Sequence, residues 1–161
     1  MRITKTYSKK AKFVFGENMV DETDKSILEI LRKNARMPFL EIAKKIGVSE
    51  STIRKRVGNM EENGTIKKYS AIIEPSKIGY GSVAIVGIDV RAEKFLNVAK
   101  KLTEYDNVKF VSTSSGDHMI MAEIWMEKSS ELRDFITNTI EKMDGVTRTC
   151  PAILNERLKE V

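Results

Sequence analysis

The sequence predicts an α+β protein with two parts, an N-terminal helix-turn-helix domain of winged-helix-like plan and a C-terminal ferredoxin-like βαββαβ sandwich domain. Three short amphipathic helical patterns follow one another in residues 19–65. Strand and helix patterns then alternate in residues 82–161. The basic residues are also concentrated in the first half, with five basic against one acidic in residues 1–18, eleven against eight in 19–73, and twelve against fourteen in 74–161. This asymmetry suggests a first part that faces a polyanion, although a small excess of lysine is also common on plain solvated surfaces.

Residues 1–18 form a basic segment without a sustained period, and we expect it to be mostly disordered. A basic arm can reach DNA phosphates or a minor groove. The simpler alternatives are a floppy extension, or a translation start that lies upstream of Met19, and the composition favours these two.

The first two helices are predicted from their caps and their apolar stripes. Asp21 is a suitable N-cap for a helix that ends near Asn34, and Pro38 suits the first turn of the next helix. Gly47 then ends that second helix. Its expected inner face consists of Leu40, Ala43 and Ile46.

The third helix begins after the N-cap Ser49 and runs to Gly64, so a tight turn joins it to the second helix. At 100° per residue, its buried stripe holds Ile53, Val57 and Met60. The outward face is short, polar and basic near the helix N-terminus, where recognition helices meet base edges. We therefore expect this face to contact double-stranded DNA rather than to be only solvated; the candidate contacts are Ser49, Ser51, Thr52, Arg54, Lys55 and Arg56. Among these, Arg56 is expected to lean back toward the buried stripe.

Residues 66–81 are predicted to be a connecting strand followed by a linker. TIKKYSAIIEP is rich in β-branched residues and stops at Pro75, and the two glycines of SKIGYG indicate a linker.

The second domain, residues 82–161, is predicted from strands in SVAIVGIDVR, VKFVSTSS, HMIMAEIWM and VTRTCPAILNERL and from helices in EKFLNVAKKLTEY and SSELRDFITNTIEKM. Both helices should cover one face of an antiparallel sheet. Because the first strand is largely apolar on both faces, we expect the other face to pack against a second copy. His118 is expected to share a strand face with Ile120 and Ala122 as a packed or interface residue.

Several classes of function are disfavoured. One cysteine, Cys150, excludes an internal disulfide and a multi-cysteine zinc site, and no cluster of metal-ligand residues or cofactor motif accompanies it. No apolar window reaches the roughly 20 residues of a membrane helix, and the N-terminus lacks a signal-peptide core. The chain also lacks a nucleophile–base pair, a glycine-rich phosphate loop and a recognisable carboxylate pair. We therefore expect no enzyme and no catalytic residues, and a cytoplasmic location on the prokaryotic nucleoid.

The order and spacing of several motifs resemble the Lrp/AsnC (feast/famine) transcription regulators: DETDKSILEILRKNAR, EIAKKIGVSESTIRKRV, IKKYSAIIEP, SGD and MDGV, from Met19 to Val161. The resemblance implies a homodimer, often assembled to an octamer, that binds operator DNA and senses an amino acid between sensor domains. It would place the effector near Ser115, Gly116, Asp117 and His118, and near Thr149 and Pro151 on the last strand. Met119 and Ile120 depart from the family pattern after Gly-Asp, so the family's ligand preference is not transferred.

Two alternatives remain at this stage. The Gly-Asp pair of the SGD stretch is also common in plain tight turns. The chain could also be an architectural protein that binds DNA through charge, with neither sequence preference nor a small-molecule response. Our prediction is a regulator of amino-acid or related metabolism whose DNA binding or assembly responds to an amino-acid effector.

Overall fold

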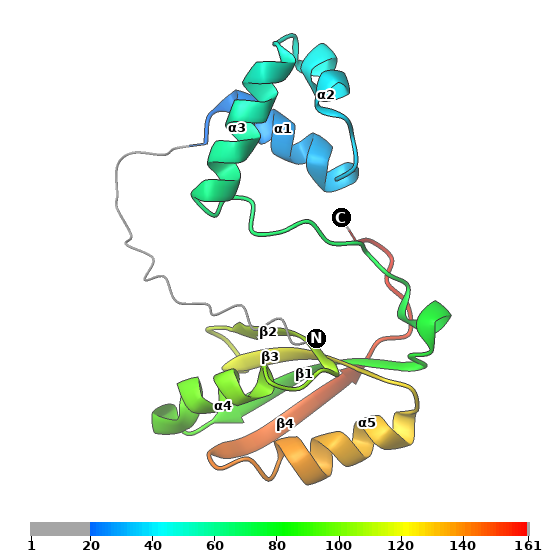
Figure 1. Cartoon of the computed structure of the whole chain (residues 1–161). Helices are drawn as coiled ribbons and strands as arrows, with labels where there is room; N and C mark the ends of the chain where they lie inside the picture. The colour runs from blue at the N-terminus through cyan, green and yellow to red at the C-terminus, as the bar shows by residue number, and fades with distance from the viewer. Residues whose placement is uncertain (1–19, 161) are drawn as a thin grey trace, which may run out of the picture. The chain divides into compact units, whose positions relative to one another are not determined.

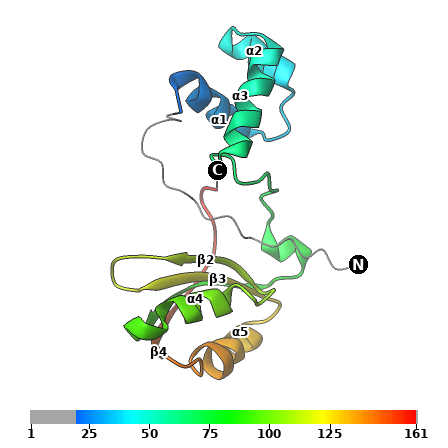
Figure 2. The same ribbon diagram turned by 60° about the vertical axis from the view of Figure 1, so that its left-hand side comes forward.

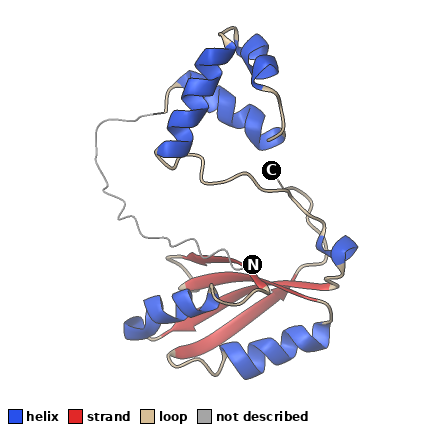
Figure 3. Ribbon diagram, viewed as in Figure 1, coloured by secondary structure: helices blue, strands red, loops and turns tan. Residues whose placement is uncertain are grey.

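The computed structural model describes residues 20–160, which divide between Ala71 and Ile72 into two compact units (Figure 1). The N-terminal unit consists of three helices, and the C-terminal unit contains all four strands, as the colouring of Figure 3 shows. Each unit has its own apolar core.

Three helices make up the N-terminal unit: α1 (Glu22–Lys33), α2 (Phe39–Ile46) and α3 (Glu50–Glu62). The Asp21 carboxylate accepts a hydrogen bond from the Asp24 backbone N–H at 2.8 Å, and Asp24 returns one to Asp21, which completes a capping box. Gly47 ends α2 in the left-handed region at φ 82°. These features confirm the predicted helix-turn-helix.

Small apolar side chains from all three helices fill the core of this unit: Ile27, Leu31, Ile42, Ala43, Ile53, Val57 and Met60. The predicted inner face of α2 is wrong at one position, because Leu40 is 50% exposed and Ile42 is fully buried instead. The stripe that packs on the core has helical spacing and consists of Phe39, Ile42, Ala43 and Ile46, which leaves Leu40 outside it. Pro38 is the N-cap of α2 rather than part of its first turn.

The predicted strand in residues 65–75 is also wrong. Ile66 packs against the helical core and donates its backbone N–H to the Met60 carbonyl at 2.8 Å, and residues 67–74 form neither helix nor strand. A short 3₁₀ turn, η1 (Pro75–Ile78), follows and is capped by Glu74. β-Branched residues favour extended backbone, but a strand also needs a partner edge, and none of the described residues supplies one.

The C-terminal unit is a four-stranded antiparallel sheet of order β2-β3-β1-β4, in which β1 is Ser82–Val90, β2 is Val108–Thr113, β3 is Ile120–Met126 and β4 is Val146–Ile153. Helix α4 (Phe95–Leu102) follows the 3₁₀ turn η2 (Ala92–Lys94). Helix α5 (Ser129–Phe135) continues into the π turn η3 (Ile136–Ile140). Both helices cover the same face of the sheet (Figure 2). The predicted βαββαβ arrangement is confirmed.

The two sheet faces differ in what covers them. Helix-facing side chains of the central strands, such as Ala84, Val86 and Ile124, are fully buried under α4 and α5. On the opposite face, Ile85, Met121 and Trp125 are only partly buried, although they are apolar. Phe110 on β2, which lies opposite Glu123 of that face, is 54% exposed. Within residues 20–160, this second face therefore lacks the helical cover that the first face has.

Candidate nucleic-acid interface and ligand-binding region

The start of α3 is built by hydroxyl groups. Ser49 is the N-cap, and its Oγ accepts the Thr52 backbone N–H at 3.1 Å. The same Oγ lies 2.8 Å from Ser51 Oγ and 2.8 Å from Thr52 Oγ1. These contacts order the first turn and leave the Ser51 side chain exposed. Ser51 can therefore offer its hydroxyl to a base edge or a phosphate.

Lys55 and Arg54 are the exposed cations of α3. The Lys55 side chain has no ion pair or hydrogen bond within residues 20–160. Arg54 is held by Glu50 one turn earlier, with Nη2 2.7 Å from Oε1, and its guanidinium lies 5.5 Å from the centre of the Phe39 ring. Lys55 is therefore ready to meet an anion, whereas Arg54 must exchange Glu50 for one.

Arg56 points back into the domain, as its place on the helix predicts. Its Nη1 donates to Asp21 Oδ2 at 2.7 Å and to Asp24 Oδ1 at 2.9 Å, both at the N-terminus of α1. The backbone N–H of Asp24 and, next, the Arg56 guanidinium hold the pKa of the Asp21 carboxyl below its usual range. The structure therefore separates Arg56 from the exposed candidate contacts.

Two further residues near this face were missed by the sequence reasoning. Glu50 could have been found, because Glu and Arg four residues apart on a helix are neighbours. Phe39 could not, because its contact with Arg54 depends on how α2 packs against α3.

At the other end of α3, the Tyr69 hydroxyl donates a hydrogen bond to Glu61 Oε1 at 2.8 Å. Burial, and next this hydrogen bond, raises the pKa of Tyr69 to about 12.

The first group of predicted effector residues lies in the β2–β3 hairpin. Ser115, Gly116 and Asp117 are exposed in its loop, which the Ser114 N–H closes onto the Met119 carbonyl at 3.0 Å. Gly116 has an ordinary backbone conformation, and a Cβ added there would meet open space. The turn itself therefore does not require glycine at this position.

His118 lies on the uncovered face of the sheet. Its Nδ1 is 3.2 and 3.3 Å from the two carboxylate oxygens of Asp89, and its ring covers Gly87, where an added Cβ would lie 2.1 Å from the ring. The expected shared face with Ile120 and Ala122 is wrong, because β3 begins only at Ile120 and the alternation of faces does not extend back to His118.

The second group of predicted effector residues lies on the other side of the sheet. Thr149 and Pro151 pair with Ile88 and Val86, whose side chains face the helices, and Thr149 Oγ1 donates to Glu141 at 2.7 Å. They line a groove of about 400 Å³ between α5 and β4. Within one chain, the sheet therefore separates Thr149 and Pro151 from His118.

Residues 20–67 match a family of winged helix-turn-helix DNA-binding domains, and residues 83–160 match the Lrp/AsnC ligand-binding domain. The transcriptional regulator LrpA of Pyrococcus horikoshii is 55% identical over 141 residues, which are 88% of this chain and all of that protein. The chain belongs to the Lrp/AsnC family. LrpA1 of Halobacterium salinarum is a more distant Lrp/AsnC relative, 39% identical over 86% of this chain and 98% of its own length.

Solved structures of transcription regulators share the fold. Escherichia coli AsnC superposes with a TM-score of 0.76 at 28% identity, over 89% of this chain and 97% of that one. A Neisseria meningitidis transcriptional regulator, solved as a complex with L-Met, gives a TM-score of 0.78 at 19% identity, over 88% and 94% of the two chains. The chain is therefore an Lrp/AsnC transcription regulator with a DNA-binding and a ligand-binding domain, and this family is not one of enzymes.

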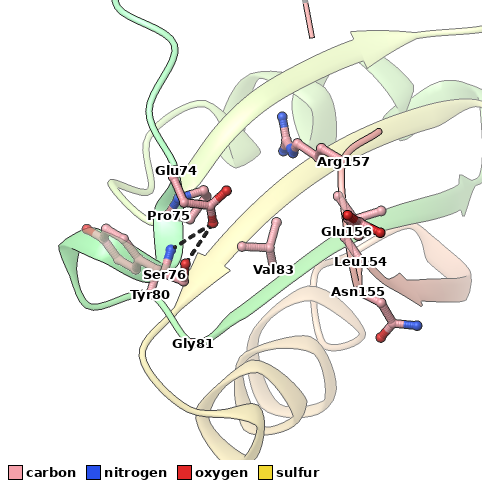
Figure 4. A pocket seen from close by; sticks show the side chains of 10 residues that line it. All are labelled: Glu74, Pro75, Ser76, Tyr80, Gly81, Val83, Leu154, Asn155, Glu156 and Arg157. Carbon is pink, nitrogen blue, oxygen red and sulfur yellow. Dashed lines mark hydrogen bonds between the residues drawn. The ribbon is translucent and has the colours of Figure 1, made fainter. Parts of the chain in front are cut away.

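This Lrp/AsnC chain contains a second cavity, of about 440 Å³, within its C-terminal unit (Figure 4). Residues 74–81, which lead into β1, form one wall, the C-terminal stretch 154–157 forms another, and Val83 lies between them. Arg157 is ion-paired with Glu123 of β3 and with Glu160. Sequence reasoning missed this cavity because it depends on how the chain end folds back.

Residues 20–160 contain no group of three or more His, Cys, Asp or Glu side chains placed to hold an ion. None of the helices in the same range has the length and apolar character needed to cross a membrane.

Proposed function

We propose that this regulator binds operator DNA as a homodimer through the N-terminal face of α3, and that an amino-acid effector modulates DNA binding or assembly. The observation that carries the proposal lies on the first turns of α3, where Ser51 is exposed and the Lys55 ammonium has no ion pair within residues 20–160. The N-terminus of this helix is ordered by Ser49. Hydroxyl and ammonium groups at this end of a helix suit base edges and phosphates in a major groove. The genes that it controls would then be those of amino-acid or related metabolism.

A homodimer is proposed from the uncovered sheet face. Ile85, Met121 and Trp125 are apolar and only partly buried there, and Phe110 is mostly in contact with solvent. Packing this face against the same face of a second copy would remove these side chains from water. The two-fold axis would also pair two helix-turn-helix units for two half-sites. We propose octamers as the further assembly and the nucleoid as the location.

An effector site shared between subunits is proposed from the separation of the candidate residues. Asp117 and its neighbours lie in an exposed hairpin loop, whereas Thr149 and Pro151 line the groove between α5 and β4. A site that used both groups would draw them from different copies. Binding would then be coupled to assembly. An amino acid is the proposed ligand class because the ligand-binding domain is that of the family and the Neisseria relative was solved with L-Met.

The DNA part is tested by selecting a duplex from a random library with the full-length protein and measuring its affinity by fluorescence anisotropy at several salt concentrations. We expect Lys55→Ala to weaken binding by about 1–3 kcal/mol if the ammonium contacts a base, with the fold unchanged. Lys45→Ala, on an exposed part of α2, is the charge-matched control. Unchanged affinity in Lys55→Ala would remove α3 from the proposed interface.

The effector part is tested by thermal unfolding of the oligomer in the presence of each of the twenty amino acids. A ligand that binds only the folded state raises its stability by RT ln(1 + [L]/Kd). We expect one or a few amino acids to raise the unfolding temperature and to change operator affinity, and Asp117→Ala to abolish this response. DNA binding without sequence preference and without any amino-acid response would instead identify a ligand-independent architectural protein.

A further inference from the structure

Arg56 differs from its two basic neighbours in what its guanidinium touches. Its two hydrogen bonds, to Asp21 and Asp24, join α3 to residues 32 and 35 positions earlier in the chain. Asp24 is largely shielded, with 16% of its side chain exposed, and 31% of the Arg56 side chain is exposed. We propose that Arg56 is a positioning residue, which orients α3 for DNA recognition and makes no DNA contact of its own; this inference rests on the proposed function.

The apolar contacts of α3 do not by themselves fix its rotation about the helix axis. Ile53, Val57 and Met60 fix α3 to the core along one stripe, and apolar burial has little directional preference. A hydrogen-bonded guanidinium beside that stripe resists rotation of the helix about its own axis. Lys55 is the adjacent residue and Ser51 lies on the same outward face, so a rotation of α3 would displace both side chains from the groove.

The anchor on α1 is itself rigid. Asp21 Oδ1 accepts the Asp24 N–H at 2.8 Å, and Asp24 Oδ2 accepts the Asp21 N–H at 3.3 Å, while each carboxylate offers its other oxygen to Arg56. Both carboxylates therefore serve the capping box and the arginine at the same time. A reoriented α3 would have to break two charge-assisted hydrogen bonds to side chains that cannot follow it.

The alternative, a direct contact of Arg56 with phosphate, conflicts with these partners. Reaching an anion would leave Asp24 shielded and unpaired, and both carboxylates would repel the approaching phosphate. Among residues 20–160, Lys55 has no such partner to leave. The charges around the two residues therefore favour different roles, in which Lys55 contacts DNA and Arg56 binds the carboxylates at the start of α1.

The test compares full-length variants Arg56→Ala, Asp24→Asn and Lys55→Ala on the selected duplex and on a random duplex of equal length. Glu22→Gln is the matched control, since it removes a carboxylate of the same turn that pairs with Lys25 at 2.6 Å and does not contact Arg56. Affinity is measured as a function of salt, and thermal unfolding checks the fold. Asn at position 24 keeps an oxygen for the cap, so Asp24→Asn is informative even where Arg56→Ala does not fold.

Positioning predicts that Arg56→Ala and Asp24→Asn both weaken binding to the selected duplex roughly tenfold, the size of one lost base contact, although they change net charge in opposite directions. The slope of log affinity against log salt should stay unchanged in Arg56→Ala, whereas in Lys55→Ala it falls by about 0.9 where that ammonium contacts a phosphate rather than a base.

The opposite results overturn the inference: a slope reduced by about 0.9 in Arg56→Ala, or tighter binding in Asp24→Asn than in Glu22→Gln. These results would make Arg56 a phosphate contact that Asp24 restrains. Failure of the wild-type protein to bind any duplex would instead overturn the proposed function.

Discussion

The two units of this chain differ in how much of their apolar surface is buried, and how many of their polar groups are paired, within a single copy. In the N-terminal unit, the apolar stripes of α1, α2 and α3 face one another. The side chains of Asp21 and Ser49 cap α1 and α3, and Arg56 forms ion pairs with Asp21 and Asp24. In the C-terminal unit, α4 and α5 cover one sheet face and leave Ile85 and Phe110 on the other. The DNA-binding unit is therefore complete within one chain, whereas the C-terminal unit retains the apolar surface that the proposed dimer would cover.

The largest expected effect tests whether the N-terminal unit is stabilised by its own core, independently of the C-terminal unit. Ile53 is fully buried between the three helices, so Ile53→Ala should lower the free energy of unfolding by about 2–5 kcal/mol through lost burial and a cavity. Hydrogen exchange should show the loss in residues 20–66 and leave protection of the sheet unchanged. Leu40→Ala, at a half-exposed position of the same unit, is the control. Equal loss of protection in the sheet would contradict the independence of the two cores.

The next effect tests the open face of the C-terminal unit. Phe110→Ala should leave the unfolding of a single copy nearly unchanged, because the ring is 54% exposed, but it should weaken dimerisation by about 2 kcal/mol if the ring is buried against a partner. Analytical ultracentrifugation over a dilution series measures the dissociation constant. Leu96→Ala is the control, since Leu96 lies on α4 and is 74% exposed. Equal dissociation constants for wild type and Phe110→Ala would exclude this face from the dimer interface.

A smaller effect concerns the ion pair that holds Arg54 on the proposed DNA-facing side of α3 in the absence of DNA. Glu50 pairs with Arg54 and carries a negative charge at the start of the helix. We expect Glu50→Gln to raise affinity for a random duplex about two- to threefold, consistent with the modest energy of an exposed helix ion pair. Anisotropy titrations at low salt measure the change, and Glu41→Gln on α2 is the control. Weaker non-specific binding in Glu50→Gln would show that this carboxylate does not restrain Arg54.

The smallest effect is the pH dependence of the capping box. The Asp24 backbone N–H and Arg56 lower the pKa of Asp21 below its ordinary value of 3.8, so the ionised form is favoured in the folded state. The resulting stability is fully present above that value and is lost as the pH falls through the lower, folded-state pKa. Asp21→Asn should make unfolding of the N-terminal unit less sensitive to acid below about pH 4, as followed by circular dichroism. An identical acid profile in wild type and Asp21→Asn would remove Asp21 from this linkage.

Local rules predicted much of this architecture. Asp21, Gly47 and Ser49 mark helix ends through bonds within a few residues, and the alternation in Ile120–Met126 correctly separates its buried and open faces. The failures depend on distant partners: the 65–75 stretch has strand residues but lacks a neighbouring edge, and His118 is oriented by Asp89 and Gly87, about 30 residues away.

The candidate sites show the same limit. The outward face of α3 follows from helical periodicity, which also correctly turned Arg56 toward the interior. The partners of Arg56 at the start of α1, Asp21 and Asp24, could not be predicted, because they lie more than 30 residues away in the sequence. Thr149 and Ser115 were grouped by family resemblance, whereas the pairing of Thr149 with Ile88 places it on the helix-covered side of the sheet and Ser115 lies in the exposed loop after β2.

The contact between Gly87 and His118 has a consequence for sequence variation. The imidazole occupies the space that a side chain on β1 would fill, since a Cβ at Gly87 would lie 2.1 Å from the ring. The two positions therefore share one fixed volume, and neither can enlarge unless the other shrinks. Across homologues this pair should covary by size: any homologue with alanine or valine in place of the glycine should carry a smaller residue, or a differently directed loop, in place of the histidine.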